Sequence, residues 1–324
     1  HYMGTTYIYY KKMGTHDRGG TVKGDVIKVS EGDDHIFIVK QFIPQLCCDM
    51  LNSASEFSTI TFDTCWIREI EEECFSAAVQ HVSKTIKIIN NRLTSVKKRT
   101  FRNLQLKEIL LNGNLIQTLE DEAFFNLTNL GTIDLGYNRL KVLNPEAFSL
   151  LPNLENLILQ HNRIQALQAR VFSFFSRRAY ILLTCNQIKR IEGGLNGMFS
   201  QITLMLEMSG NNVEELSNGV FSNHTFGILD LANNPLKKIS PSFCENCNVE
   251  SFYFSCRYLT LEDVQMIANW GEDYRVHLYG NGCPQYNMTF AYEFPQATCN
   301  QEKSSGVCFC LFYLGVLINV IRMF

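Results

Sequence analysis

Cysteine and histidine are the residue types in this chain whose spacing could support chemistry. Cys185 follows His161 by 24 residues, which is also the period of the repeat described below, so the two side chains would lie in equivalent positions of neighbouring units, about 5 Å apart. A thiol beside an imidazole base could act as a nucleophile. The simpler interpretation is a reduced or glutathionylated surface cysteine beside an ordinary contact histidine. Because the sequence carries no phosphate loop, carboxylate pair or acyl-enzyme motif, we expect no enzyme.

Four cysteines near the end of the chain could instead hold a metal ion. Cys244 and Cys247 form a C-x-x-C motif, and Cys256 and Cys283 follow it, so four thiolates are present for Zn²⁺. Their spacing fits no familiar zinc finger, and a redox C-x-x-C lacks its usual surrounding fold here. Disulfides explain the same residues more simply. We therefore expect disulfides, with no metal site and no cofactor.

The elements that must position these residues form an internal repeat. Residues 106–127, 130–151 and 154–175 share the pattern L-x-x-L-x-L-x-x-N-x-L-x-x-L-x-x-x-x-F-x-x-L. Apolar residues two apart, such as Ile109 and Leu111, put both side chains on one face of a short strand, and the later apolar positions fill the return coil. One unit of about 24 residues cannot bury enough apolar surface to offset its backbone entropy. The units must therefore stack into a solenoid.

A ladder of polar residues accompanies the apolar pattern at the ninth position of each unit. Asparagine has both donors and acceptors, so it can satisfy backbone groups that stacking would otherwise bury without partners. Cys65 takes this position in the first coil, and Arg257 interrupts the ladder. The predicted ladder comprises Asn91, Asn114, Asn138, Asn162, Asn186, Asn211, Asn234 and Asn281.

These positions, from Phe57 to Cys283, resemble the 24-residue class of extracellular leucine-rich repeat domains, which includes Toll-like receptor ectodomains, neuronal adhesion receptors and insect immune proteins. The resemblance implies an α/β fold: a leucine-rich repeat solenoid with a right-handed coil, a parallel β-sheet on the concave face and cysteine-containing caps at both ends. It also implies non-enzymatic recognition of a protein or microbial ligand in innate immunity or cell adhesion. The coil that ends in Asn281 and Cys283 resembles a C-terminal cap, in which Cys299 would pair with Cys283.

The sequence departs from the family at both ends. Cys47 and Cys48 are adjacent, which is unusual, and the C-terminal cap lacks the usual C-x-C. No apolar run of signal-peptide length lies in residues 1–30. We interpret the chain as a fragment or an inaccurate gene model, so export is inferred from other features.

Composition favours an extracellular protein over a nucleic-acid-binding one. The formal net charge is −3, which gives no basic excess, and 12 cysteines are crowded outside the central repeats, as expected in an oxidising compartment. Three N-x-T sequons predict glycosylation at Asn126, Asn223 and Asn287. We therefore expect a secreted or cell-surface glycoprotein.

The chain divides by composition into five segments. The first is expected to be poorly ordered, the second is an N-terminal cap with the first coil, the third contains the repeats, the fourth is the C-terminal cap and the fifth is a hydrophobic tail. Their bounds are 1–34, 35–80, 81–256, 257–300 and 301–324.

The two C-terminal segments carry separate expectations. A helix should begin after Thr260, with Asp263 completing an acidic capping box and with Leu261, Val264, Ile267 and Ala268 on its buried side. Residues 307–324 are apolar but interrupted by Asn319 and Arg322. Three interpretations stay open for them: a truncated transmembrane segment that attaches the chain to a membrane, a removable lipid-anchor signal, or a gene-model artefact or cap helix.

The same pattern predicts a ligand-binding surface. The second, third, fifth, seventh and eighth residues of each unit leave the core and should face the concave side. Basic residues come first on this face (Lys84, Lys87, Lys107), and acidic residues come later (Asp134, Glu155, Glu207, Asp230, Glu250). Between them lies an aromatic and aliphatic group, as hot spots require. The predicted site comprises Leu110, Tyr137, Ile158, His161, Tyr180 and Leu182.

The leading functional hypothesis is thus an extracellular recognition module with a protein ligand or a microbial surface component as its partner. The alternative is a structural protein, either an extracellular-matrix component or a homodimerising scaffold. A monomeric mass in solution would disfavour the dimer.

Overall fold

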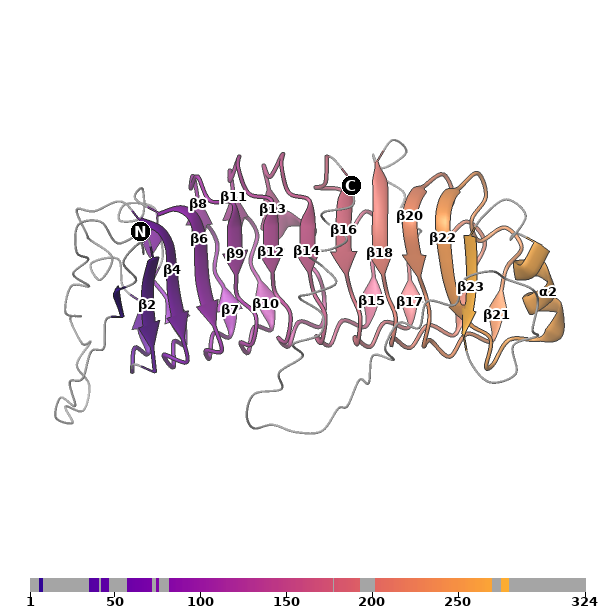
Figure 1. Cartoon of the computed structure of the whole chain (residues 1–324), viewed down its shortest axis with the longest axis horizontal. Helices are drawn as coiled ribbons and strands as arrows, with labels where there is room; N and C mark the ends of the chain where they lie inside the picture. The colour runs from indigo at the N-terminus through magenta and orange to yellow at the C-terminus, as the bar shows by residue number, and fades with distance from the viewer. Residues whose placement is uncertain are drawn as a thin grey trace, which may run out of the picture.

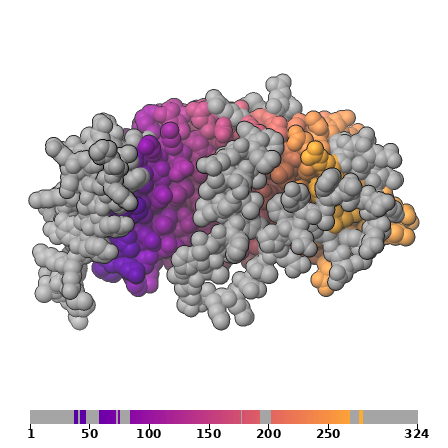
Figure 2. All heavy atoms as spheres, in the orientation of Figure 1, coloured from indigo at the N-terminus to yellow at the C-terminus, as the bar shows by residue number. Residues whose placement is uncertain are grey.

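The computed structural model describes residues 6–7, 35–40, 42–46, 57–71, 74–75, 82–176, 178–192, 202–269 and 275–279. Successive coils each contribute one strand to a parallel sheet that runs along the long axis (Figure 1), and they follow one another in sequence order (Figure 2). This is the leucine-rich repeat solenoid that the spacing predicts, so the predicted fold class is confirmed.

The long sheet is made by the strand that opens each coil. Its order is β1-β2-β4-β6-β9-β12-β14-β16-β18-β20-β22-β23, and every neighbouring pair is parallel. The strands are β1 Thr6–Tyr7, β2 His35–Val39, β4 Phe57–Asp63, β6 Val82–Ile89, β9 Glu108–Leu110, β12 Thr132–Asp134, β14 Asn156–Ile158, β16 Ala179–Leu182, β18 Thr203–Glu207, β20 Thr225–Asp230, β22 Asn248–Ser255 and β23 Arg275–Tyr279.

Shorter strands lie on the return path of the coils. They pair between neighbouring coils as β3-β5, β7-β10, β15-β17, β19-β21 and β8-β11-β13. Their bounds are β3 Gln45–Leu46, β5 Glu69–Ile70, β7 Ser95–Val96, β8 Phe101–Arg102, β10 Thr118–Leu119, β11 Phe124–Phe125, β13 Phe148–Ser149, β15 Ala166–Leu167, β17 Arg190–Ile191, β19 Glu215–Leu216 and β21 Lys238–Ile239; the 3-10 helix η2 spans Pro145–Ala147.

The core fills the coil between these two layers. Since the strands pair in register, the middle residue of each falls into one buried row, as at Ile109, Ile133 and Leu157. On the outer side, phenylalanine rings stack from coil to coil: Phe101 on Phe124 and Phe124 on Phe148, each with ring centroids 5.5 Å apart. Stacked rings bury large apolar areas between coils, which is why a single unit cannot fold alone.

The ladder asparagines lie inside the turn that follows each long strand. Asn138 is 6% exposed; its side-chain oxygen accepts from the Ile116 N–H at 2.9 Å, and its amide donates to the carbonyls of Leu111 and Leu135 at 3.0 Å. Equivalent bonds join each later coil to the one before it, so the ladder satisfies backbone groups of two coils at once. The same burial is found at Asn91, Asn114, Asn162, Asn186, Asn211 and Asn234.

Cys65 takes over the donor half of this role in the first coil. Its sulfur donates to the carbonyl of Ile38 at 3.1 Å and to that of Asp63 at 3.4 Å, residues 27 and 2 positions back in the chain. Asn138 donates to Leu111 and Gly136 at the same two separations. A thiol is a weak donor and a poor acceptor, so it replaces the amide group but not the side-chain oxygen.

The C-terminal end is less regular. The pairing of β18 with β20 shifts register between Leu204 and Met205, and helix α2 (Leu261–Asn269) follows β22. The predicted capping box is confirmed: the Thr260 hydroxyl accepts from the Asp263 N–H at 3.1 Å, and the Asp263 carboxylate accepts from the Thr260 N–H at 3.2 Å. Val264 is buried, but Leu261 is 65% exposed, because the packed face of the helix begins only one turn after its first residue.

Several predictions fall outside the described residues. These are Cys47, Cys48, Asn281, Cys283, Asn287, Cys299 and the tail 307–324. Within the part of the chain that is described, no helix is long and apolar enough to cross a membrane. The predicted segment bounds stay predictions; inside the first segment, Thr6 and Tyr7 pair in parallel with Ile36 and Phe37.

Candidate functional site

Strand register places three of the six predicted ligand-binding residues in one row across the sheet. Leu110 and Ile158 both pair with Asp134, and Leu182 pairs with Ile158. Side chains at paired positions point to the same side of a sheet, so this row lies on the face opposite the core. The row continues beyond Leu182 through Glu207 and Asp230.

Leu182 does not offer the exposed surface that the pattern predicts. Its side chain is 1% exposed, whereas Leu110 and Ile158 are partly exposed. Leu182 lies between Ile158 and Glu207 in adjacent strands, and large neighbours at paired positions cover one another. This member of the predicted site is therefore corrected to a buried position.

Tyr137 and His161 lie just beyond the strands, where the chain turns. Their rings stack with centroids 4.4 Å apart and planes 14° from parallel. Tyr137 is 37% exposed, while burial lowers the pKa of His161 below its ordinary value. A stacked, partly exposed pair gives a flat and rigid contact surface.

The backbone at this turn has a left-handed conformation in every coil. The residue that precedes each ladder position has φ between 50° and 75°, a region that glycine and asparagine enter most readily. Four coils indeed place glycine or asparagine there. The full set is Thr64, Asn90, Gly113, Tyr137, His161, Cys185, Gly210 and Asn233.

The other coils break this preference. Near the N-terminus the residues are Lys40 (φ 55°) and Thr64 (φ 56°), and in three neighbouring middle coils they are Tyr137 (φ 55°), His161 (φ 53°) and Cys185 (φ 55°). Each larger side chain holds the left-handed conformation at a cost of roughly 1 to 2 kcal/mol. Such strain is a pointer to function where a second feature of the same residues agrees with it. Two of the middle coils also carry the Tyr137–His161 stack.

Cys185 does not form the nucleophile that its spacing from His161 suggests. Its side chain is 9% exposed and its sulfur is disulfide-bonded. A disulfide sulfur carries no thiolate for an imidazole base to activate. The interpretation as a reduced or glutathionylated surface cysteine is corrected by the same bond.

Tyr180 is engaged with an acidic group on the same face. Its hydroxyl donates to the Glu207 carboxylate at 3.0 Å. Burial, helped by the charge of Asp230, raises the pKa of Glu207 to about 7 despite that bond. Burial also raises the pKa of Asp230 to about 6, although the Ala232 N–H donates to its carboxylate at 2.8 Å. Tyr180 therefore belongs to a polar cluster rather than to an apolar hot spot.

Three of the four cysteines considered as zinc ligands are oxidised instead. Cys244 and Cys247 form a disulfide with each other, and Cys256 is disulfide-bonded as well. Among the described residues, no cluster of three or more histidine, cysteine or acidic side chains could hold a metal ion. The disulfide interpretation of Cys244 and Cys247 is confirmed.

The sequons lie on the outer turns. Asn223 is exposed and accepts a bond from Asn246 at 3.5 Å, whereas Asn126 is half-buried and donates to Asn103 at 2.8 Å. These placements leave the Asn223 amide nitrogen the more accessible of the two. Asn287 lies outside the described residues.

The positions that the sequence analysis assigns to the concave face do not include the residue directly after each ladder position. In the first coil this residue is Trp66, which is 42% exposed and has the Arg92 guanidinium 3.8 Å from its ring centroid. The same position recurs with Arg139 and Arg163 in later coils. An alignment of the repeats shows that arginine recurs at this position. Sorting residues only into core and concave positions does not reveal it.

Comparisons with known proteins agree with this geometry. A family model described as "Leucine rich repeat" matches residues 105–164, and one described as "BspA type Leucine rich repeat region (6 copies)" matches residues 49–115 and 195–265. No curated protein matches the chain.

Two solved structures are similar in architecture. One is the TLR13–ssRNA13 complex (17% identity, TM-score 0.44), which covers 76% of this chain and 44% of that one. The other is the Drosophila Toll–Spätzle complex (14% identity, TM-score 0.47), which covers 79% of this chain and 48% of that one. The chain spans less than half the length of either protein, and neither likeness identifies a ligand for it.

Proposed function

The chain belongs to the leucine-rich repeat proteins, and from that premise we propose that it is a non-enzymatic extracellular recognition module. Its ligand would be a protein or a microbial surface component, recognised in innate immunity or cell adhesion. The contact surface would centre on Tyr137 and His161, with Leu110 and Ile158 beside them on the sheet.

One observation carries the proposal. Tyr137 and His161 occupy left-handed turn positions at which neighbouring coils place glycine or asparagine, so the fold is stabilised less by these residues than by the alternatives. What they add is a stacked aromatic surface, of which Tyr137 remains 37% exposed. Tyrosine supplies contact area with few rotors to freeze, which suits a binding hot spot.

The compartment is argued from the cysteines. Cys244 and Cys247 are joined, and Cys185 and Cys256 are also disulfide-bonded. Structural disulfides persist in oxidising compartments, which supports secretion or cell-surface display. We expect a glycan on the exposed Asn223 in the first place, and on Asn126 and Asn287 by their sequons.

The experiment uses variants that should fold at least as well as the natural chain. The double variant Tyr137→Asn, His161→Asn restores the residue type that tolerates the left-handed turn, and Tyr258→Asn is the control because Tyr258 is 50% exposed but lies beyond β22. Binding of purified protein to an array of extracellular proteins and to intact microbial cells is compared for the three forms. We expect specific binding that the double variant loses and the control keeps. Binding retained by the double variant would move the site elsewhere, and a dimeric mass in solution with no binding would favour the scaffold.

A further inference from the structure

Cationic side chains follow the ladder on one edge of the solenoid. Arg92, Arg139 and Arg163 each come directly after a ladder asparagine, and Lys141 comes two residues after Arg139. The Arg139 N–H donates to the Ile116 carbonyl and the Arg163 N–H to the Leu140 carbonyl, both at 2.8 Å. Neighbouring strands lie about 4.8 Å apart, and these residues follow the ends of the long strands β6, β12 and β14, so they form a row along that edge. We call Arg92, Arg139, Lys141 and Arg163 the basic flank.

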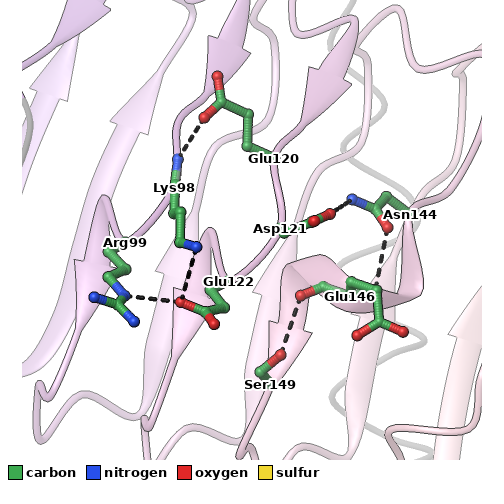
Figure 3. Close-up of polar contacts among 8 residues, drawn as sticks. All are labelled: Lys98, Arg99, Glu120, Asp121, Glu122, Asn144, Glu146 and Ser149. Carbon is green, nitrogen blue, oxygen red and sulfur yellow. Dashed lines mark hydrogen bonds and ion pairs between the residues drawn. The ribbon is translucent and has the colours of Figure 1, made fainter.

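The basic flank differs from the other cationic groups in how its charges are balanced. Within the described ranges, none of its four side chains has a carboxylate within 4 Å. On the outer side of the coil the opposite holds: Lys98 and Arg99 both meet Glu122, at 3.6 and 2.8 Å (Figure 3). Farther along the flank's own edge, Lys237 holds the position of its coil that is equivalent to Lys141, and there it is bonded to Glu214 at 2.6 Å.

Such a row is unfavourable unless an anion complements it. Like charges at paired positions of neighbouring strands repel, and the solenoid stacks Arg139 directly beside Arg163. Arg92, Lys141 and Arg163 are exposed and Arg139 is partly exposed, so the charges face solvent. Four cations on one edge of a chain whose net charge is −3 make a local positive field that attracts a polyanion.

We propose that the basic flank binds a sulfated polysaccharide chain lying along the solenoid axis. A guanidinium group offers a planar fork of donors that fits an oxyanion bidentately, and a row with the period of the coils fits a linear ligand with regularly spaced charges. This surface goes beyond the proposed protein-binding function and does not depend on it, although Tyr137 and His161 each lie two residues before an arginine of the row.

One feature favours a sulfated glycan over single-stranded nucleic acid. Nucleic acid binds by stacking bases on open aromatic faces as well as by charge. The aromatic residue at the end of this row, Trp66, has the Arg92 guanidinium 3.8 Å from its ring centroid, so this face of the ring is not open to a base.

The test compares heparin oligosaccharide binding by the whole chain and by two triple variants. Arg139→Gln, Lys141→Gln, Arg163→Gln removes three charges from the basic flank, and Lys97→Gln, Lys98→Gln, Arg99→Gln removes three from the outer side as a matched control. We expect the first set to weaken binding about tenfold, as three exposed charge contacts would, and the control to change it less than about twofold. Leu115→Arg fills the gap in the row between Arg92 and Arg139, and it should tighten binding, a gain that misfolding cannot mimic.

Other outcomes overturn the proposal. Equal losses in both triple variants would show a response to net charge alone. Equal binding of desulfated heparin, or absence of heparin binding by the folded wild type at physiological salt, would exclude sulfate recognition. Single-stranded RNA of matched length that binds more tightly than heparin, through the same three residues, would make the surface a nucleic-acid site instead.

Discussion

The middle coils and the coils on either side of them solve the same turn with different residues. Asn90, Gly113, Gly210 and Asn233 enter the left-handed turn at little cost, whereas Tyr137, His161 and Cys185 enter it against their preference. The ladder asparagine that follows makes the same bonds in both regions. Stacking therefore fixes the backbone of every coil. A residue type that does not suit this backbone conformation must be explained by something other than fold stability.

The largest expected change in stability comes from the asparagine ladder, which both regions share. Asn138→Ala strands the Ile116 N–H, whereas the Leu111 and Leu135 carbonyls keep their bonds from the Asn114 and Asn162 amides. The unsatisfied donor and the lost amide bonds should destabilise the fold by roughly 1 to 3 kcal/mol. Asn114→Ala, in an adjacent coil with a glycine turn, should cost about the same. Chemical denaturation of both variants measures this, and a loss confined to one region would show that the ladder is not common to them.

The next effect concerns a partly buried acid, Glu207, at the edge of the middle coils. Burial raises the pKa of Glu207 to about 7 from an ordinary 4.5, so between those pH values the folded state binds more protons than the unfolded state. Its stabilising contribution is present below pH 4.5 and is lost as pH rises through 7. Glu207→Gln keeps an acceptor for the Tyr180 hydroxyl and should raise stability at pH 8 by about 1 to 2 kcal/mol.

Thermal melting of wild type and Glu207→Gln at pH 4.5 and 8 checks the sign. The gain should be present at pH 8 and close to zero at pH 4.5. Glu155→Gln is the control, since that side chain is exposed on the same face. A gain of equal size at both pH values would mean that titration of Glu207 is not its cause.

A smaller loss of stability is expected from substituting Gly113, in a coil beside the middle coils where glycine already suits the left-handed turn. Gly113 has φ 72°, and an added Cβ would lie 2.5 Å from the Asn90 side-chain oxygen. Gly113→Ala should therefore destabilise by about 1 kcal/mol or slightly more, with Gly131→Ala as the control because the nearest atom there is 3.8 Å away. If Gly113→Ala were neutral in urea titrations, the left-handed turn would carry no strain and the contrast between the regions would fail.

Much of the fold could be predicted from the sequence because stacking repeats one set of demands. The ladder positions and the Thr260–Asp263 capping box follow from local patterns that tertiary packing only reinforces. The candidate site could be predicted only in part. Leu182 lies in an outward position yet is 1% exposed, because burial on the open face depends on neighbours in adjacent coils rather than on its own repeat.

Two features of the surface escaped prediction for different physical reasons. The bonding of Cys185 joins residues distant in sequence, and spacing alone cannot select one pairing among twelve cysteines. The basic flank is hidden by a net charge of −3, because a sum over the chain averages a cationic edge with acidic residues such as Glu207 and Asp230 on another face.

Tyr137→Asn should change stability least, and it tests most directly whether the middle coils differ from the flanking coils because of function. Tyr137→Asn replaces a strained residue by the one that Asn90 and Asn233 supply at the same turn, so it should stabilise the fold by about 0.5 to 1 kcal/mol. It also removes one ring of the stack with His161, so it should weaken ligand binding by about 1 kcal/mol or more. A variant that folds better and binds worse would establish that the middle coils hold Tyr137 for recognition. If Tyr137→Asn destabilised the fold instead, the ring would be a packing residue, and the left-handed turn would no longer distinguish the two regions by function.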